Sequence, residues 1–351
     1  MKSYLTGYKG GKIMKVTVLM PVYNAEEFLK ETIDSILNQS YKDFEFLIIN
    51  DGSKDKSVEI IEGYSDERIR LIHNEENMGL IKTLNRGIEL AKGKYIARMD
   101  ADDIAELNRL EIQVDYMEKN EDVALVGSNG TMFLSKKPMV KKPSNFPTKY
   151  EDIRCKLLFE STFMHPAVMM RRSVLIENNY RYRLEYKATE DYGLWVEIAK
   201  EHKVVNLPNK LLNYRIVSSS ITNQALKNME ERVKVMKRIY SVGLDDLGVE
   251  YSEEELDIHA EIALSSTLRH FKYTKKSVGE WLEKLMKTNE KTKKYDSVTF
   301  KKEIAEQYFR ISVYNGNYVD YKKSMCAKIN PKSFFAYMKA KTAVKIKQMV
   351  R

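Results

Sequence analysis

Three aspartates close together carry the clearest chemical signal in this sequence. Asp100, Asp102 and Asp103 follow the apolar run Tyr95–Met99, which predicts a strand that delivers the carboxylates to its carboxyl end. Carboxylate oxygens are hard ligands that suit Mg²⁺ or Mn²⁺, the ions that accompany substrate diphosphates. Ligands of open α/β sheets bind beyond the carboxyl ends of the strands. An aspartate-rich strand end is also common in turns and helix caps, so the signal does not decide the function alone.

Further motifs accompany the aspartates along the chain. Two strand-like runs end in turns, namely Val16–Asn24 and Phe44–Ser53, and downstream come His165-Pro166 and Thr189-Glu190-Asp191. In this order and spacing the motifs resemble the inverting family 2 glycosyltransferases of the GT-A fold, over roughly residues 14 to 220. As a set they are specific in a way that no single motif is.

The pattern of strands and helices predicts an α/β architecture before any family is considered. Apolar residues recur at helical spacing over residues 25–39, 54–63 and 79–91, between strand-like runs that begin at residues 16, 44, 69 and 95. Strands separated by helices form mostly parallel sheets through right-handed crossovers. A late strand is predicted at 211–216, followed by helices at 226–240, 253–271, 278–288 and 298–314. The predicted fold is therefore a mostly parallel, GT-A-like sheet flanked by helices, with a helical C-terminal region.

The expected domains are a GT-A catalytic domain over residues 14–222 and a helical region with a basic amphipathic tail over 223–351. Residues 1–13 lack the apolar core of a signal peptide. The run Lys9–Met14 is one that a purine-rich ribosome-binding sequence would encode. We therefore expect the native protein to begin at Met14, after a disordered extension.

Two other nucleotide-binding classes are excluded by the first turn. A dinucleotide-binding dehydrogenase needs a glycine-rich G-x-G-x-x-G turn that lets the backbone approach a pyrophosphate. Here the same place reads Pro21-Val22-Tyr23-Asn24, followed by Ala25 and two glutamates. These bulky and acidic residues would block and repel the phosphates. A sugar-nucleotide pyrophosphorylase would also need a glycine-rich loop with a lysine.

Composition limits the setting of the protein. The two cysteines, Cys155 and Cys326, have neither disulfide nor metal-site spacing, which favours a reducing cytoplasm. No stretch approaches the roughly 20 apolar residues that span a bilayer. The net charge is +9, and the segment from Lys332 to Arg351 has six basic and no acidic residues. This charge favours an anionic membrane surface over nucleic acid, because no nucleic-acid recognition motif accompanies it.

The resemblance implies where the donor nucleotide binds. Asp51 matches the position that receives the pyrimidine base, and an aspartate that accepts from an imide N–H favours uracil or thymine over cytosine. It is also a residue that begins an Asp-Gly turn. The other implied contacts to the nucleotide sugar are Pro21, Tyr23, Asn24, Lys82, Arg98, Asp100 and His165. The default for Lys82 and Arg98 is a solvated surface charge, and that for His165 is a structural role.

The resemblance also implies the catalytic groups. Asp102 is the expected direct ligand of Mn²⁺ or Mg²⁺, whereas Asp100 contacts the ribose or a metal-bound water. The ion offsets charge on the departing diphosphate. Asp103 is expected to cap a helix that begins near Ile104. Asp191 is the expected general base and Glu190 the neighbouring alternative, although by themselves two acids in the first turn of a helix indicate only favourable helix electrostatics.

Two departures from the family pattern narrow the expectation. Many relatives carry a histidine just after a tyrosine-arginine pair, but here Tyr214-Arg215 is followed by Ile216-Val217, so a third protein ligand of the metal is not expected. The Q-x-x-R-W motif of processive polysaccharide synthases does not follow Asp191. The transfer of one sugar per encounter is therefore expected.

The sequence thus predicts an inverting, metal-dependent glycosyltransferase. It would move a hexose or N-acetylhexosamine from a UDP-sugar to a hydroxyl of a saccharide or lipid-linked saccharide in surface polysaccharide synthesis. Two alternatives stay open: a catalytically silent carbohydrate-binding protein, and transfer to a polyprenyl phosphate, for which Arg183 and Lys187 would supply cations. The expected location is cytoplasmic and peripheral on the inner face of the plasma membrane, with the basic tail either on the lipid or packed on its own domain.

Overall fold

The computed structural model describes residues 15–135, 137–217, 228–268, 271–314 and 318–350. The predicted extension over 1–13 and the predicted domain boundary at 222 lie outside these residues. The chain forms two compact units that interleave in sequence. The first comprises the chain up to Phe146 together with Phe163–Tyr182 and Asn206–Val217, and the second comprises Pro147–Thr162, Arg183–Val205 and the chain from Ser218 onward.

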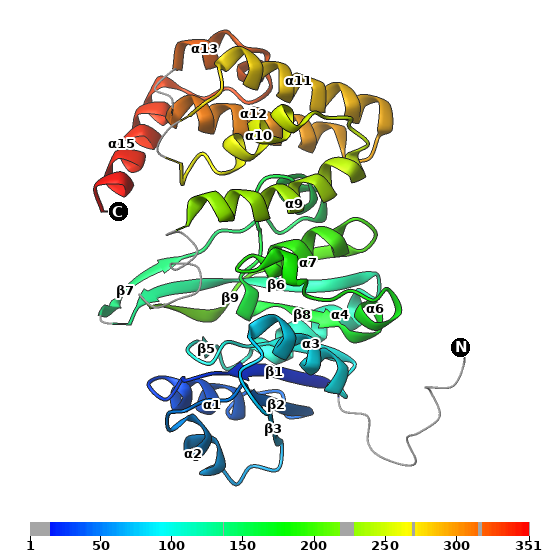
Figure 1. The fold of residues 1–351 in the computed structure, drawn as a ribbon, viewed down its shortest axis with the longest axis vertical. Coiled ribbons are helices and arrows are strands. Elements are labelled where there is room, and N and C mark those ends of the chain that lie inside the picture. The colour runs from blue at the N-terminus through cyan, green and yellow to red at the C-terminus, as the bar shows by residue number, and fades with distance from the viewer. Residues whose placement is uncertain (1–14, 136, 218–227, 269–270, 315–317, 351) are drawn as a thin grey trace. The chain divides into compact units, whose positions relative to one another are not determined.

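The first unit is built on parallel strands, as predicted. β1 (Val16–Val22) pairs in parallel with β2 (Phe44–Asn50) and with β4 (Tyr95–Arg98), and β2 pairs with β3 (Ile69–His73). Every residue of β2 and β4 is buried, which fits central strands covered on both faces. Figure 1 shows β1, β2 and β3 side by side, with α1 (Leu29–Leu37) and α2 (Ser57–Glu62) beside them. The carboxyl ends of these strands therefore lie along one edge.

The sheet continues on the other side of β4 with antiparallel strands. Its order among the described residues is β3-β2-β1-β4-β8-β6-β9-β5, with β7 paired to β6. The added strands are β5 (Ile104–Ala105), β6 (Val123–Leu134), β7 (Lys137–Pro143), β8 (Met169–Arg171) and β9 (Lys203–Ile216). The helices of this unit are α1, α2, α3 (Leu80–Leu90), α4 (Arg109–Lys119) and α6 (Arg172–Glu177), with a 3-10 turn, η1, at His165–Ala167. The predicted strand at 211–216 is thus the end of a longer strand.

The second unit is helical, which confirms the predicted C-terminal region. Its elements are α5 (Tyr150–Lys156), η2 (Leu184–Tyr186), α7 (Glu190–Ala199), α9 (Met229–Leu247), α10 (Glu253–Ala263), α11 (Lys275–Thr292), α12 (Ser297–Tyr314), α13 (Tyr318–Lys323), α14 (Met325–Ile329) and α15 (Phe334–Val350). Buried aromatic residues form its core. His259 accepts a hydrogen bond from Trp281 on Nδ1 and contacts the Leu158 carbonyl through Nε2 at 2.8 Å, which explains why a fully buried histidine is tolerated there.

Two local predictions need correction. The predicted helix near Ile104 is wrong, because Ile104 and Ala105 form β5 and pair with Asn213 and Leu212 of β9. The next helix begins only at Arg109. The helix predicted over residues 25–39 begins at Leu29. Residues before it are used elsewhere, since the Ala25 amide donates to Ser57 Oγ at 2.9 Å and the Glu26 amide to Asp55 Oδ2 at 3.0 Å. None of the helices in the described part of the chain is long and apolar enough to cross a membrane.

Candidate active site

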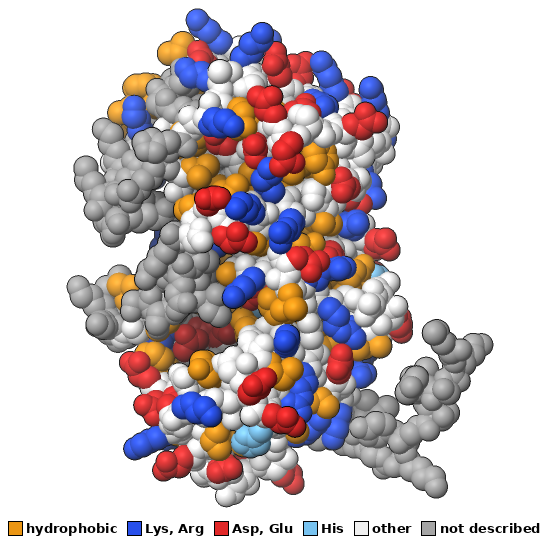
Figure 2. Space-filling model, in the orientation of Figure 1, with side chains coloured by type: hydrophobic (Ala, Val, Ile, Leu, Met, Phe, Trp, Pro, Cys, Tyr) orange, Lys and Arg blue, Asp and Glu red, His pale blue; other side chains and the backbone are white. Residues whose placement is uncertain are grey.

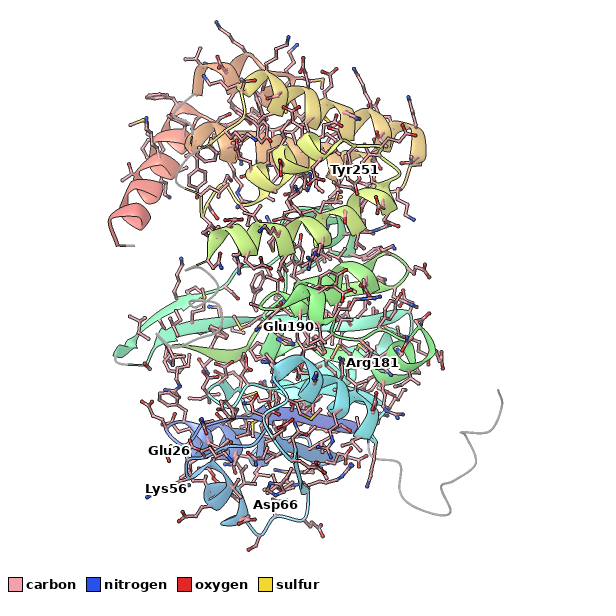
Figure 3. All side chains as sticks on the ribbon, in the orientation of Figure 1. Glu26, Lys56, Asp66, Arg181, Glu190 and Tyr251 are labelled. Carbon is pink, nitrogen blue, oxygen red and sulfur yellow. The ribbon has the colours of Figure 1, made fainter. Side chains whose placement is uncertain are left out.

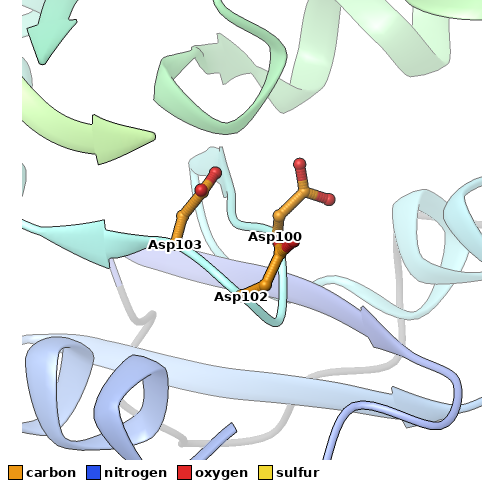
Figure 4. Close-up of side chains that lie close together, drawn as sticks. All are labelled: Asp100, Asp102 and Asp103. Atoms are coloured by element: carbon orange, nitrogen blue, oxygen red, sulfur yellow. The ribbon is translucent and has the colours of Figure 1, made fainter. Parts of the chain in front are cut away.

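Asp100 and Asp102, the pair predicted at the metal, come together with Asp103 in the first unit. The chain turns after β4 and carries Asp100, Asp102 and Asp103 before it enters β5 (Figure 4). One carboxylate oxygen from each side chain lies within 4.8 Å of the others. Asp100 and Asp102 are partly exposed, whereas Asp103 is fully buried. We call residues 100–103 the acidic turn.

Hydrogen bonds from α1 and β9 fix the acidic turn. The Thr32 hydroxyl of α1 lies 3.0 Å from the Ala101 carbonyl and 2.8 Å from the Asp103 carbonyl. Arg215 of β9 donates from Nε to the Asp102 carbonyl at 2.7 Å, and its main-chain amide donates to Asp103 Oδ1 at 2.7 Å. Asp103 therefore does not cap a helix, because its carboxylate joins the turn to β9.

Arg215 is itself held on every side. Its guanidinium lies between the rings of Phe28 and Phe133, at 4.2 and 4.7 Å from their centroids. It also donates to Glu31 Oε2 of α1 at 2.5 Å. Planar stacking and a forked set of donors are properties of arginine that lysine lacks. The carboxyl end of β9, the start of α1 and the acidic turn are therefore one connected structure.

Buried arginines compensate the charge of the acidic turn. Arg98, at the end of β4, is 2% exposed and forms an ion pair with Asp100. Arg109 of α4 donates to the Arg98 carbonyl at 2.7 Å, and burial together with the Arg98 charge lowers the pKa of Arg109 to about 9. Arg98 was predicted to contact phosphate or sugar. Its contact with Asp100 also orients one of the predicted ligands.

Burial dominates the proton affinity of the aspartates. Burial and the nearby Asp100 charge raise the pKa of Asp102 to about 6. Burial and both neighbouring carboxylates raise the pKa of Asp103 well above its usual value. Burial, with smaller effects of the three aspartates, also raises the pKa of the Tyr214 phenol. Crowded carboxylates of this kind gain from a bound cation.

The acidic turn fits a divalent metal ion. Its donors are hard oxygens, which Mg²⁺ and Mn²⁺ prefer over softer ligands. Ligands about 2.1 Å from an octahedral ion lie about 3 to 4.2 Å apart, close to the spacing of these carboxylates. Among the described residues, Asp103 Oδ2 is a buried oxygen without a hydrogen-bond partner. Asp102 and Asp100 are the more exposed pair that would hold the ion.

Asp51, predicted to receive the nucleobase, is engaged with the protein. It is 4% exposed at the end of β2. Its Oδ1 accepts from Asn74 Nδ2 at 2.6 Å and from the Met78 amide at 2.9 Å, and its Oδ2 accepts from the Gly79 amide at 2.9 Å. Asp51 thus fixes the loop that leads into α3. Any contact with a base must be made beside these three hydrogen bonds.

The turn after β1 has two different kinds of predicted residue. Pro21 lies within β1 and faces Ile49 of β2 in register. Asn24 has a positive φ of 48°, which asparagine tolerates, and its Oδ1 accepts from the Lys54 amide at 2.8 Å. Tyr23, by contrast, is 51% exposed. Tyr23 is the side chain of this turn that is available for stacking on a ligand.

Lys82 and His165 lie in different environments. Lys82 is exposed in the first turn of α3. The His165 ring contacts the Tyr182 hydroxyl through Nε2 at 2.9 Å, and burial, with a smaller effect of the Arg98 charge, lowers the pKa of His165 well below its usual value. His165 is therefore a neutral imidazole at pH 7, and the positive charge of Arg98 adds to the effect of burial.

Asn85 of α3 holds the residue that contacts His165. Its amide group donates to the Tyr182 carbonyl at 2.7 Å and accepts from the Tyr182 amide at 3.0 Å. This two-point contact joins α3 to a segment 97 residues later in the chain. The sequence offered no signal for this pair, because neither residue belongs to a motif that separates it from ordinary surface polar residues.

Glu190 and Asp191, the predicted bases, begin α7 in the second unit (Figure 3 labels Glu190). Glu190 is 6% exposed and Asp191 is half-buried. The loop before them is fixed to α7, because a Cβ at Gly193 would overlap the Tyr186 ring and Arg183 Nε pairs with Glu197 at 2.6 Å. The first turn of α7 therefore has a defined position within this unit.

Arg232 of α9 is a cation that the sequence analysis did not single out. α9 packs on α7, and burial lowers the pKa of Arg232, while Tyr240 and Asp191 have smaller, raising effects. Its Nε and Nη1 are buried without a hydrogen-bond partner among the described residues. The second unit thus places a buried guanidinium near the predicted base.

Comparison with known proteins decides the family. Residues 17–178 match the family described as glycosyl transferase family 2. A UDP-Glc:alpha-D-GlcNAc-diphosphoundecaprenol beta-1,3-glucosyltransferase of Escherichia coli is 30% identical over 223 residues, which are 63% of this chain and 85% of that protein. The chain belongs to glycosyl transferase family 2. It is therefore a glycosyltransferase, which confirms the expected enzyme class.

Solved structures support the same fold. Residues 1–349 of TarS of S. aureus, in complex with UDP-GlcNAc, match with a TM-score of 0.58 and 15% identity, and the match covers 87% of this glycosyltransferase and 93% of that TarS fragment. The mannosyltransferase PcManGT of Pyrobaculum calidifontis, in complex with GDP-Man and Mn²⁺, matches with a TM-score of 0.52 and 15% identity. The match covers 93% of this glycosyltransferase and 87% of the PcManGT chain. At this identity the likeness establishes the fold of the glycosyltransferase and nothing finer.

Proposed function

We propose that this glycosyltransferase transfers a hexose or N-acetylhexosamine from a UDP-sugar to a hydroxyl of a lipid-linked saccharide, with inversion and one sugar per encounter. The observation that carries the proposal is the acidic turn, in which Asp100 and Asp102 stand at the carboxyl end of a central strand beside buried Arg98. The named activity of the Escherichia coli relative, which uses UDP-Glc and a diphosphoundecaprenol-linked acceptor, supports both the donor and the acceptor class. A second Escherichia coli relative, named an O-antigen biosynthesis glycosyltransferase, is 34% identical over 221 residues, which are 61% of this chain and 85% of that protein, and it supports the assignment to surface polysaccharide synthesis.

In the proposed reaction the acceptor hydroxyl attacks the anomeric carbon of the donor. The new glycosidic C–O bond forms as the bond between that carbon and the diphosphate oxygen breaks, and the electron pair leaves on the UDP. Asp191 accepts the hydroxyl proton. Because the attack comes from the face opposite the leaving group, an α-linked donor gives a β-linked product. Glu190 is the alternative proton acceptor.

The leaving diphosphate must be neutralised. Asp102 and Asp100 would hold a Mg²⁺ or Mn²⁺ ion, which would supply positive charge against the negative charge that develops on the UDP. Arg215 and Thr32 keep the acidic turn in place through their contacts with its main chain. In this proposal Tyr23 stacks on the uracil, and Lys82, which is exposed in the first turn of α3, contacts a phosphate. Asp51 shapes the wall of the nucleotide pocket.

Transfer to a polyprenyl phosphate has less support. This alternative would need free cations near Asp191, and Arg183 is paired with Glu197 at 2.6 Å. Lys187 is exposed and is the one of the two that stays available. A catalytically silent protein has no support, since the acidic turn and the Glu190-Asp191 pair are both present. With a lipid-linked acceptor, we propose that the enzyme works at the inner face of the plasma membrane.

A donor screen tests the proposal. The purified chain is incubated with UDP-, GDP-, CMP- and dTDP-sugars, with and without Mn²⁺, and the released nucleotide is measured. We expect release from a UDP-sugar that depends on the metal and is lost in Asp102→Asn. Release from a GDP-sugar alone would overturn the assignment. So would equal release from a UDP-sugar with Mn²⁺ and with a chelator in place of Mn²⁺.

A further inference from the structure

The helices at the end of the chain form a small core of their own within the second unit. Tyr337, on α15, is 3% exposed and packs with Phe309 of α12, Tyr321 of α13 and Cys326 of α14. Ala340, one turn further along α15, lies against the same cluster. The beginning of α15 is therefore part of the folded unit and presents a fixed outer face.

That outer face carries large apolar side chains in solvent. Phe334 is 59% exposed, Phe335 78% and Met338 43%. Residues four apart share a side of a helix, so Phe334 and Met338 lie together. The Phe334 ring also stacks on the Tyr337 ring, with 6.1 Å between their centroids, so the core holds one face of Phe334 while the rest stays exposed. Val319 of α13 and Met325 of α14 are also more than half exposed. These residues stand on three helices that share one core, and several exposed large apolar residues on adjoining helices are typical of an interaction surface.

The same helices carry an excess of positive charge. Within residues 318–342 there are six lysines, namely Lys322, Lys323, Lys328, Lys332, Lys339 and Lys341. The acidic residue of this segment, Asp320, is paired with Lys275 of α11 at 3.0 Å. Lys332 pairs with Glu306 at 3.0 Å, whereas Lys322, Lys323, Lys328 and Lys339 are exposed. Figure 2 shows hydrophobic and Lys or Arg side chains interspersed at the end of the second unit where α13 and α15 lie.

We propose that this basic aromatic surface, formed by Val319, Met325, Phe334, Phe335 and Met338 with Lys322, Lys323, Lys328 and Lys339, docks on a bilayer that contains anionic lipid. The occupant follows from the combination of groups. Exposed phenylalanines enter the boundary between headgroups and acyl chains, and lysines around them meet the negative headgroups. A nucleic acid would use the lysines but would leave Met338 and Val319 in water.

Docking rests on the proposed function in one respect. A lipid-linked acceptor is confined to the membrane, so an enzyme held on the same surface meets it at a higher local concentration. The proposed docking residues belong to three helices that share one core, and not to a free tail. Removing the chain after Asn330 would also remove Tyr337 from the core, and side-chain variants are therefore the sharper test.

Vesicle sedimentation with the full chain tests the docking. Vesicles of phosphatidylcholine are compared with vesicles that also contain phosphatidylglycerol, at low and high salt. We expect the protein to pellet with the anionic vesicles alone and to be released by salt. The triple variant Phe334→Ser, Phe335→Ser, Met338→Ser should lower the partition coefficient by about ten-fold or more. Val298→Ser, a similarly exposed residue of α12, is the matched control and should change nothing.

A charge variant and a size measurement complete the experiment. Lys322→Gln, Lys323→Gln and Lys328→Gln together should remove most of the salt-sensitive binding and leave the unfolding temperature unchanged. Equal pelleting of the wild type and the triple serine variant would overturn the docking. Size-exclusion chromatography without vesicles gives the second outcome that would overturn it. If the wild type forms oligomers and the triple serine variant does not, the surface joins two copies of the chain. Donor hydrolysis without vesicles is measured in parallel, and its absence would count against the proposed function and not against docking.

Discussion

Arg215 Nε donates a hydrogen bond of 2.7 Å to the main-chain carbonyl of Asp102, although 113 residues separate them in the chain. The bond connects the last strand of the sheet to the turn that holds the predicted metal ligands. The Arg215 guanidinium is fixed by the rings of Phe28 and Phe133 and by the carboxylate of Glu31. The position of Asp102 therefore depends on a residue that need not touch the metal or the donor.

Arg215→Lys should weaken metal-dependent donor binding. Lysine keeps the charge but cannot stack between two rings while reaching both Glu31 and the Asp102 carbonyl. Loss of one such hydrogen bond is worth about 0.5 to 1.5 kcal/mol, so the Kd for Mn²⁺ in the presence of UDP should rise about two- to ten-fold. Titration calorimetry measures it.

Arg68→Lys is the matched control for this variant. Arg68 also bonds a carbonyl, that of Leu37, pairs with Asp66 and stacks on the Phe44 ring at 4.6 Å. Phe44 begins β2, so these contacts lie at the end of the sheet opposite the acidic turn. Both variants should lower the unfolding temperature, and Arg215→Lys alone should change the Kd. Equal Kd values in the two variants would remove Arg215 from the positioning role.

The elements that the sequence predicted well are those with local patterns. Three features follow from residues that are close together in the sequence: the strand that ends at Arg98, the aspartates after it and the helix predicted over residues 79–91. The structure has all three nearly as predicted. Burial fixes such patterns, because the central strands are apolar on both faces.

Long-range contacts were not predictable in this way. The Arg215–Asp102 bond and the Asn85–Tyr182 contact join segments about a hundred residues apart, and no local pattern in a single sequence encodes such a pairing. The same reason explains the error at Ile104. Asp103 before an apolar pair suggested a helix cap, but pairing with β9 stabilised a short strand instead.

Asp102→Asn should abolish metal-dependent binding of UDP. The amide keeps the size of the side chain and removes the negative charge that holds a hard cation. Calorimetric titration with UDP, with and without Mn²⁺, should show binding in the wild type that requires the ion and no ion effect in the variant. Asp115→Asn, a surface residue of α4 paired with Lys119, is the control. An unchanged Mn²⁺ response in Asp102→Asn would mean that the acidic turn is only a structural turn.

The metal response should disappear in acid. The pKa of Asp102 is raised from 3.8 to about 6 by burial and by Asp100. Between these values the folded protein binds a proton that the unfolded chain has released, so this group makes the metal-free protein less stable as the pH rises from about 4 to about 6. Above about 6 the ionised carboxylate is available to a cation. Thermal unfolding should show stabilisation by Mn²⁺ and UDP at neutral pH that is lost as the pH falls through about 6, and stabilisation that persists at pH 4 would contradict this.

Asp51→Asn separates a structural from a base-reading role. Its carboxylate accepts hydrogen bonds from Asn74, Met78 and Gly79, and in either orientation an amide NH₂ would face at least one of these donors. The free energy of unfolding should fall by about 1 to 3 kcal/mol in urea denaturation. If Asp51 also accepts from uracil, the variant should lose more affinity for UDP than for CDP. An equal loss for both nucleotides would leave Asp51 with the structural role alone.

Asp191→Asn should separate binding from chemistry. The variant keeps the shape of the first turn of α7 and removes the proton acceptor, so the Kd for UDP with Mn²⁺ should stay within about two-fold of the wild type. The transfer rate should fall by a factor of about 10² to 10⁴, the usual contribution of a positioned base. Glu190→Gln, one residue earlier in the same turn, is the internal comparison and should lower the rate less. Because Arg232 lies on α9, which packs on α7, and its charge interacts with Asp191, Arg232→Gln should also slow transfer, whereas Arg238→Gln, from an exposed position of α9, should not. Near-normal turnover in Asp191→Asn with a severe loss in Glu190→Gln would assign the proton to Glu190.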